Sequence, residues 1–263
     1  MSEHGTPAVK PADDPAFNLP PSLAKLWLPL CAIGLIALVV GYVVGGTVSA
    51  KFAMSAYLTA FMYCLTITIG CLFFVLIQHL CRAGWSVVVR RIAELIMIMI
   101  VPLAILFIPI VVSFGGEGVL YSWDHPDYAE IFHLDNTIWD TKTGWLTSGW
   151  FTVRACIYFL IWSAIAIYFS RGSVRLDETG EKSVTARLQW WSGPGVVLFA
   201  LVTTLAAFDW IMSLAPMWFS TMFGVYLFAG SILSAHCAIT VGAYLLQRNG
   251  AMRDEVTPEH YHD

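Results

Sequence analysis

Five ionisable side chains lie within otherwise apolar stretches of the sequence: His79, Glu94, Arg154, Asp209 and His236. A charged group inside a bilayer costs roughly 2.5–3.5 kcal/mol on insertion scales, so such groups by default face protein or water and mark functional sites. Carboxylates and imidazoles take up and release protons, and a neighbouring guanidinium favours the ionised form of a carboxylate. The set therefore makes proton transfer at membrane depth the chemistry to consider.

Six apolar runs must position these groups. The chain is 58% hydrophobic and only 12% charged, with a mean hydropathy of +0.70, whereas about a quarter of the residues of soluble proteins are charged. Each run approaches the roughly 20 residues that cross a bilayer as a helix. The sequence therefore predicts an all-α, polytopic membrane helix bundle over residues 26–246. We place its six transmembrane helices at Leu26–Val48, Tyr57–Cys81, Ile92–Ser113, Trp150–Ser170, Pro194–Leu214 and Ser220–Leu246.

Lysine and arginine are distributed unevenly between the two sides of this predicted bundle. With six spans, both termini share one side with the segments around Arg82–Arg91 and Arg171–Gly193, whereas the other side carries Lys51 and Lys142. Because cytoplasmic segments carry the excess of positive charge, we expect both termini in the cytoplasm and the 115–149 loop outside. The cytoplasmic side then holds eleven of the fourteen basic residues: Lys10, Lys25, Arg82, Arg90, Arg91, Arg171, Arg175, Lys182, Arg187, Arg248 and Arg253.

The helical rise of about 1.5 Å per residue sorts the five ionisable groups into two layers. Arg154 and Asp209 lie within ~8 Å of the outer surface, and His79, Glu94 and His236 lie in the cytoplasmic half. Structural roles remain open for all of them. Arg154 and Asp209 could form an ion pair that ties two helices together, and Glu94 could pair with a residue one turn away, Arg90. Either histidine could be an ordinary hydrogen-bonded side chain.

The pattern of cysteines and glycines predicts that this chain binds no cofactor. The six cysteines form no C-x-x-C or C-x-x-C-H motif, which iron–sulfur ligation and covalent haem attachment require. No phosphate-binding glycine loop precedes a helix, so we do not expect ATP-driven transport by this chain. The composition points to the lipid bilayer as a partner and to no nucleic acid.

The segments outside the spans also carry signals. The 115–149 loop holds or borders Trp123, Trp139, Trp145 and Trp150, and exposed aromatic patches usually mark contacts. We expect this loop to pack over the bundle mouth and to touch an extracytoplasmic subunit. Residues 1–25 are proline-rich and predict a disordered cytoplasmic arm. Residues 247–263 predict a cytoplasmic tail.

Several of these stretches together resemble the NrfD/polysulfide-reductase-type membrane subunits. They are YLTAFMYCLTITIGCLFFVLIQHL, RRIAELIMIMIVPLAILFIPI, YSWDHPD, WFTVRACIYFLIW and FDWIMSLAPMWFSTMFG. The pattern is most similar to the second quinone-binding-type subunit of alternative complex III, a bacterial quinol:cytochrome c oxidoreductase. Members of that family are usually longer, with about ten spans in two four-helix bundles, so the chain resembles a C-terminally truncated member whose tail would link to further helices.

The resemblance implies a subunit of the bacterial inner membrane that carries no redox cofactor of its own. It implies iron–sulfur and haem c subunits as partners, quinone or quinol at a shared site, and an ordered set of protonatable residues that form half-channels. Asp209 would be the outer proton acceptor, held ionised by Arg154. His79, Glu94 and His236 would be the cytoplasmic groups.

Two other classes of function compete with this interpretation. A b-type cytochrome could use His79 and His236 as axial haem ligands, since both lie in the cytoplasmic half. A free-standing ion or solute transporter would be expected to have broken helices and an internal repeat. The only sign of a broken helix in the sequence is the pair Pro102 and Pro109 in the third span.

Overall fold

The computed structural model describes residues 25–115, 117–131, 136–250 and 256–259, and every regular element in these ranges is a helix. Six segments are long and apolar enough to cross a membrane, which confirms the prediction of a six-span helical bundle. The expected disordered arm at 1–25 lies almost wholly outside the described residues, as does much of the expected tail at 247–263. The orientation of the termini stays a prediction.

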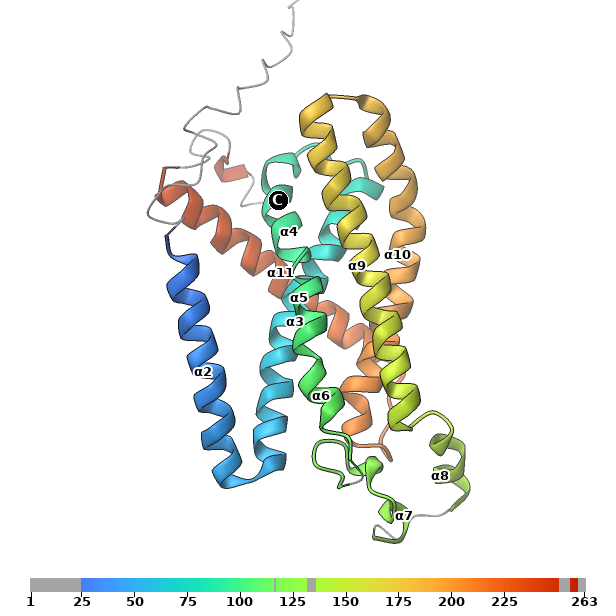
Figure 1. The fold of residues 1–263 in the computed structure, drawn as a ribbon. Helices are drawn as coiled ribbons and strands as arrows, with labels where there is room; N and C mark the ends of the chain where they lie inside the picture. The colour runs from blue at the N-terminus through green and yellow to red at the C-terminus, as the bar shows by residue number, and fades with distance from the viewer. Residues whose placement is uncertain (1–24, 116, 132–135, 251–255, 260–263) are drawn as a thin grey trace, which may run out of the picture.

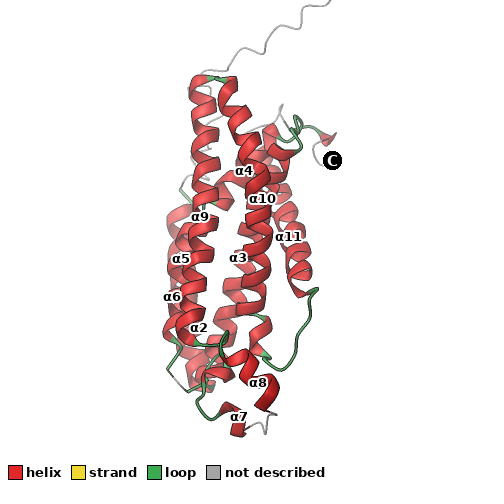
Figure 2. Cartoon of the chain, turned by 90° about the vertical axis from the view of Figure 1, so that its right-hand side faces the viewer, coloured by secondary structure: helices red, strands yellow, loops and turns green. Residues whose placement is uncertain are grey.

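The bundle is built from long helices (Figure 1). Most of their connections are short, but a long loop precedes α9 and an extended segment joins α10 to α11. The α-helices are α2 (Trp27–Val48), α3 (Ala50–Leu80), α4 (Val87–Met97), α5 (Ile100–Leu106), α6 (Ile108–Val112), α7 (Tyr128–Ile131), α8 (Asn136–Thr143), α9 (Ser148–Thr179), α10 (Lys182–Trp210) and α11 (Phe223–Arg248). The described residues also form two short 3₁₀ helices, η2 (Ser122–Asp124) and η3 (Met212–Leu214). The long loop, with α7 and α8, lies at one end of the bundle, and the α9–α10 turn lies at the other (Figure 2).

The third span consists of three consecutive pieces, α4, α5 and α6. Its breaks precede Pro102 and Pro109, because a proline lacks the N–H that would bond to the fourth residue before it and its ring crowds that residue's carbonyl. The Tyr57 hydroxyl of α3 donates a 2.6 Å hydrogen bond to the Leu106 carbonyl beside the second break. That bond satisfies a backbone group that apolar surroundings would otherwise leave without a partner.

The α9–α10 pair is longer than the apolar runs indicate, because the segment Arg171–Gly193, expected as a loop, is a helical hairpin. Gly180 ends α9 in the left-handed conformation (φ 62°), and its N–H bonds to the Leu176 carbonyl at 2.9 Å. A side chain other than hydrogen is strained at that φ. Near this turn Leu188 packs directly on Gly172. The apolar runs are shorter than the helices that contain them. Polar residues extend both helices beyond the apolar runs, because a helix forms equally well in water.

Helices α3 and α11 approach each other closely at Gly70. A Cβ atom on Gly70 would lie 2.0 Å from the Ser231 carbonyl oxygen and 2.8 Å from Ala235 Cβ, so only glycine fits there. The small residues of α11 therefore act in packing, as small residues commonly do between membrane helices. The hydroxyls of Thr59 and Thr66, on the same helix as Gly70, donate to carbonyls of α3 itself.

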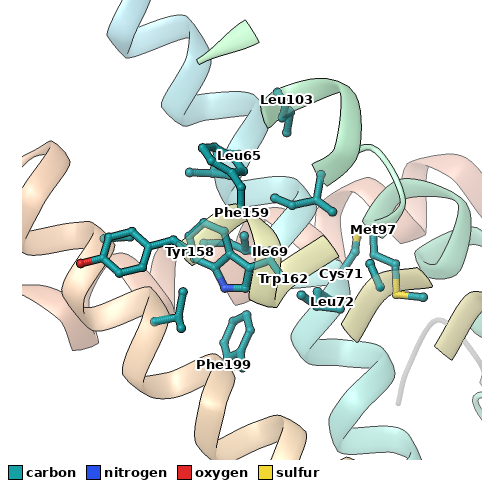
Figure 3. Packing of buried hydrophobic residues seen from close by; sticks show 14 of the residues in the cluster. Leu65, Ile69, Cys71, Leu72, Met97, Leu103, Tyr158, Phe159, Trp162 and Phe199 are labelled. Carbon is teal, nitrogen blue, oxygen red and sulfur yellow. The ribbon is translucent and has the colours of Figure 1, made fainter. Parts of the chain in front are cut away.

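Aromatic side chains fill the centre of the bundle (Figure 3). Trp162 of α9 and Trp210 of α10 are fully buried, with ring centroids 5.8 Å apart. Phe107 lies 4.6 Å from Trp210, and Phe159 is stacked on Trp210 at 5.3 Å. Such contacts each add about 0.5–1.5 kcal/mol beyond area burial. This core joins the middle of α9 to the end of α10.

Candidate functional site: a buried carboxylate and its donors

The only carboxylate with no exposed surface among the described residues is Asp209, the penultimate residue of α10. The helix ends just beyond it, and η3 turns the chain away. Because α10 ends here, the Asp209 backbone carbonyl has no helical N–H partner. The Ser213 hydroxyl donates a hydrogen bond to it instead. The end of α10 and the start of η3 therefore hold this backbone in place, and the Asp209 side chain points at the facing helix α9.

Four donors surround the Asp209 carboxylate. Arg154 of α9 binds it through two nitrogens, with Nε 2.7 Å from Oδ2 and Nη2 3.0 Å from Oδ1. The Tyr158 hydroxyl donates to Oδ2 at 2.7 Å, and the Trp145 indole N–H donates to Oδ1 at 2.7 Å. Each oxygen thus accepts two hydrogen bonds, which matches the roughly four acceptor sites of a carboxylate. The arrangement fits the ionised form.

The guanidinium of Arg154 is held on a second side as well. Its Cζ atom lies 4.1 Å from the centroid of the Trp145 ring, a cation–π contact. The Arg154 side chain is only 11% exposed. The ion pair between Arg154 and Asp209 that the sequence suggested is therefore present. It is part of a four-residue polar group that also contains Trp145 and Tyr158.

The long loop packs over this group, as expected from its aromatic residues. Leu120, Tyr121, Trp123 and Tyr128 are buried, and the Tyr121 hydroxyl donates to the Trp210 carbonyl at 3.0 Å. Burial raises the pKa of the Tyr121 phenol well above its usual value, and the negative charge of Asp209 raises it further. The phenol therefore stays a hydrogen-bond donor. Whether the loop also touches another subunit stays a prediction.

A cavity of about 210 Å³ lies beside this group, between the loop and the segment that joins α10 to α11. Trp145 and Ser213 both line it, so the cavity borders the donors of Asp209. The ammonium of Lys142 also lines it, donates to the Pro216 carbonyl and lies 5.7 Å from the Phe219 ring centroid. Trp145 as a whole residue is 45% exposed, so it stands between the carboxylate and the surface.

A second group of charges surrounds Glu94 of α4, which is only 2% exposed. The predicted partner Arg90 is in place at 3.5 Å, but Arg91 lies closer, at 2.9 Å. Arg91 also contacts Asp177 of α9, and Ser173 of α9 forms a hydrogen bond with Glu94. The group therefore connects α4 to the part of α9 near the α9–α10 turn, at the far end of the bundle from Asp209.

His79 of α3 lies in the same region and is buried. Its ring makes an edge contact with Phe169 of α9 at 5.3 Å. Among the described residues its Nδ1 atom has no hydrogen-bond partner. A buried polar atom without a protein partner is a common position for an ordered water. His79 and the Glu94 group thus both pack against α9.

His236 lies on a different helix, α11. The residue is exposed, with Nδ1 2.8 Å from the Ile232 carbonyl, and its ring meets Phe74 of α3 at 5.5 Å. The buried face of α11 carries Ser231 and Ala235, so His236 stands at the exposed edge of that face. His79 meets Phe169 of α9, whereas His236 meets Phe74 of α3. Haem ligation by the two histidines stays an untested alternative.

Sequence reasoning missed two of the four residues in the Asp209 group. Tyr158 follows Arg154 by four residues, and this spacing puts both on one face of α9. Trp145 lies in the long loop, and no local pattern marks it as a partner of Asp209. No protein-family model and no curated protein matches the sequence.

Proposed function

We propose that this chain is an integral membrane subunit of a bacterial respiratory quinol:cytochrome c oxidoreductase, similar to alternative complex III. It carries no redox cofactor of its own and contributes to proton translocation in the inner membrane. Iron–sulfur and haem c subunits outside the membrane take the electrons, and quinol binds at a site shared with other membrane subunits. The resemblance of the span sequences and the placement of the buried charges support this proposal.

The observation that carries it is the fully buried Asp209 with its four donors. Membrane proteins bury carboxylates in this way mainly where protons or ions pass. A second buried carboxylate, Glu94, lies with His79 at the opposite end of the same bundle. Two protonatable layers, one toward each face, are what two half-channels require.

Proton uptake by Asp209 requires that one of its oxygens lose a donor, since all four acceptor sites are in use. Three of the four bonds come from Arg154 and Tyr158 on the transmembrane helix α9. The fourth comes from Trp145, which precedes α9 and borders the outer cavity. Movement of Trp145 away from Asp209 frees Oδ1 for a proton and opens the route to the cavity.

The test measures protons released per electron during quinol oxidation by the purified complex in vesicles. Asp209→Asn alone leaves Arg154 buried and unpaired, which by itself lowers assembly. The informative variant is therefore the double change Arg154→Met with Asp209→Asn, which removes both charges. We expect it to assemble and to oxidise quinol while proton release falls to the part that quinol chemistry supplies alone. Proton release equal to wild type in an assembled double variant would make the pair structural and overturn the role.

A further inference from the structure

Lys142 of the long loop reaches the segment that joins α10 to α11. Its ammonium donates to the Pro216 carbonyl, 74 residues later, and lies 5.7 Å from the centroid of the Phe219 ring. Lys142 and Pro216 also line the cavity of about 210 Å³ between these two parts of the chain. The half-buried lysine side chain therefore ties one wall of this cavity to the other.

The backbone of Lys142 places Trp145. The Lys142 carbonyl accepts the Trp145 N–H at 3.0 Å and the Leu146 N–H at 2.8 Å. These bonds close the turn that follows α8, so the backbone at Trp145 stays at a fixed spacing from Lys142. The Leu146 side chain packs against the core on the same turn. From this backbone position the Trp145 indole reaches Asp209.

The carbonyl that Lys142 holds is itself fixed relative to Asp209. Pro216 is buried and follows η3, whose Ser213 hydroxyl donates to the Asp209 backbone carbonyl. The Trp145 indole donates to the Asp209 carboxylate at 2.7 Å. The loop therefore meets the end of α10 at Trp145 and the segment beyond it at Lys142. Release of the second contact lets the loop backbone shift and draw the indole away from the carboxylate.

The strength of the Lys142 contact suits a hold that can open. A hydrogen bond from a charged group shifts an equilibrium by roughly tenfold to a hundredfold. A cation over an aromatic ring adds a smaller contribution where the site is partly exposed. Trp145 is itself exposed, so burial does not lock its ring in place. These contacts therefore favour the closed position of Trp145 without making it permanent.

We propose that Lys142 is a positioning residue for proton transfer at Asp209. It holds the loop backbone where the Trp145 indole covers the carboxylate, and thereby sets how often the Asp209 oxygens are open to the cavity. The part in proton transfer rests on the proposed function of the chain. The hold on Trp145 does not depend on that function, so the two are tested separately.

The first experiment observes Trp145 in the purified full chain in detergent micelles. Tryptophan is replaced with fluorotryptophan, fluorine NMR resolves the ring in its bound and displaced positions, and Trp145→Phe assigns its signal. Lys142→Met removes the ammonium but keeps an unbranched side chain, whereas Lys142→Arg keeps a cation that can donate to the Pro216 carbonyl. Lys51→Met, at an exposed lysine in the first turn of α3, is the matched control.

We expect the ratio of displaced to bound Trp145 to rise by roughly tenfold or more in Lys142→Met. The ratio should stay near the wild-type value in Lys142→Arg and Lys51→Met. Saturation transfer between the two signals measures the ratio even where the displaced state is rare. A wild-type ratio in Lys142→Met would overturn the proposal. An equal rise in Lys51→Met would overturn it too, because the effect would then follow from the loss of any lysine.

The second experiment measures protons released per electron by the complex in vesicles. We expect Lys142→Met to oxidise quinol and to release fewer protons, because a carboxylate that stays open to the cavity returns its proton to the side from which it came. Lys142→Arg should restore the wild-type value, since it keeps the cation. A displaced Trp145 with wild-type proton release would support the hold by Lys142 and contradict the proton role of Asp209. An undisplaced Trp145 would contradict the hold and leave that role to the double variant.

Discussion

The indole nitrogen of Trp145 donates a 2.7 Å hydrogen bond to the carboxylate of Asp209, 64 residues later in the chain. The same ring covers the guanidinium of Arg154, the counter-ion of that carboxylate. One residue of the long loop therefore contacts both members of a buried ion pair. Trp145 therefore joins the long loop to α9 and α10. A change that displaces the loop also removes a hydrogen bond from Asp209.

Trp145→Phe separates the hydrogen bond from the ring contact. Phenylalanine keeps an aromatic face over Arg154 but lacks the N–H. Because hydrogen bonds to charged groups contribute about 1.5–3 kcal/mol, we expect the free energy of unfolding in mixed micelles to fall by about that amount. Cleavage of the loop by added protease should also become faster. Trp150→Phe, at a largely exposed position, is the control, and equal losses in the two variants would contradict a specific bond.

Asp209→Asn is expected to destabilise the protein by about 3–5 kcal/mol, because it leaves the buried Arg154 without its counter-charge. Combining it with Arg154→Met removes the uncompensated charge, so most of that loss should be recovered. Unfolding curves of the two single variants and of the double variant form a thermodynamic cycle. A double variant whose loss equals the sum of the single losses would show that the pair is not coupled.

Gly70→Ala tests the crossing of α3 and α11. The added methyl would lie 2.0 Å from a backbone oxygen of Ser231, and overpacking of this kind costs typically about 1–3 kcal/mol. Gly230→Ala is the matched control, because its Cβ meets nothing within 4 Å. It should be neutral or stabilising by roughly 0.5–1 kcal/mol, since glycine weakens a helix. Thermal unfolding of both variants in detergent checks the difference, and equal behaviour would argue against this close contact.

Stability at high pH should depend on Tyr121. Its folded-state pKa is raised above the unfolded value of about 10, so the folded protein retains a proton that the unfolded chain loses. The contribution is complete below about pH 10 and declines as the pH rises above it. Tyr121→Phe should therefore lose the 3.0 Å bond to the Trp210 carbonyl, at about 0.5–1.5 kcal/mol near neutral pH. Its stability should then fall less steeply than that of wild type between pH 10 and 11.

Topology is tested with two single cysteines at opposite ends of the bundle. Thr141 lies in α8 of the long loop, and Glu181 lies at the turn between α9 and α10; both are exposed. With the long loop outside, an impermeant maleimide should modify Thr141→Cys in intact cells and Glu181→Cys only after lysis. The reverse order of labelling would invert the orientation.

The sequence by itself determined the class of the protein and the depth of its charges. Crossing a membrane depends on the hydropathy of about 20 consecutive residues, a local property, and six such segments are indeed helices. Local counting also placed Arg154 and Asp209 at similar depth, where two opposite charges in an apolar layer favour contact. The Arg90–Glu94 pair followed from helical spacing alone.

The tertiary structure decided which face of each helix is buried and which distant residues meet. Trp145 reaches Asp209 only because the long loop folds back over the bundle, and a hydrogen bond between residues 64 positions apart has no local signature. The contact at Gly70 places Ser231 and Ala235 in the centre of the interface with α3 and leaves His236 exposed at its edge, where its ring meets Phe74. Packing against neighbouring helices decides which face of a helix is buried. A helix that is apolar on every face has no stripe in its sequence that predicts this face.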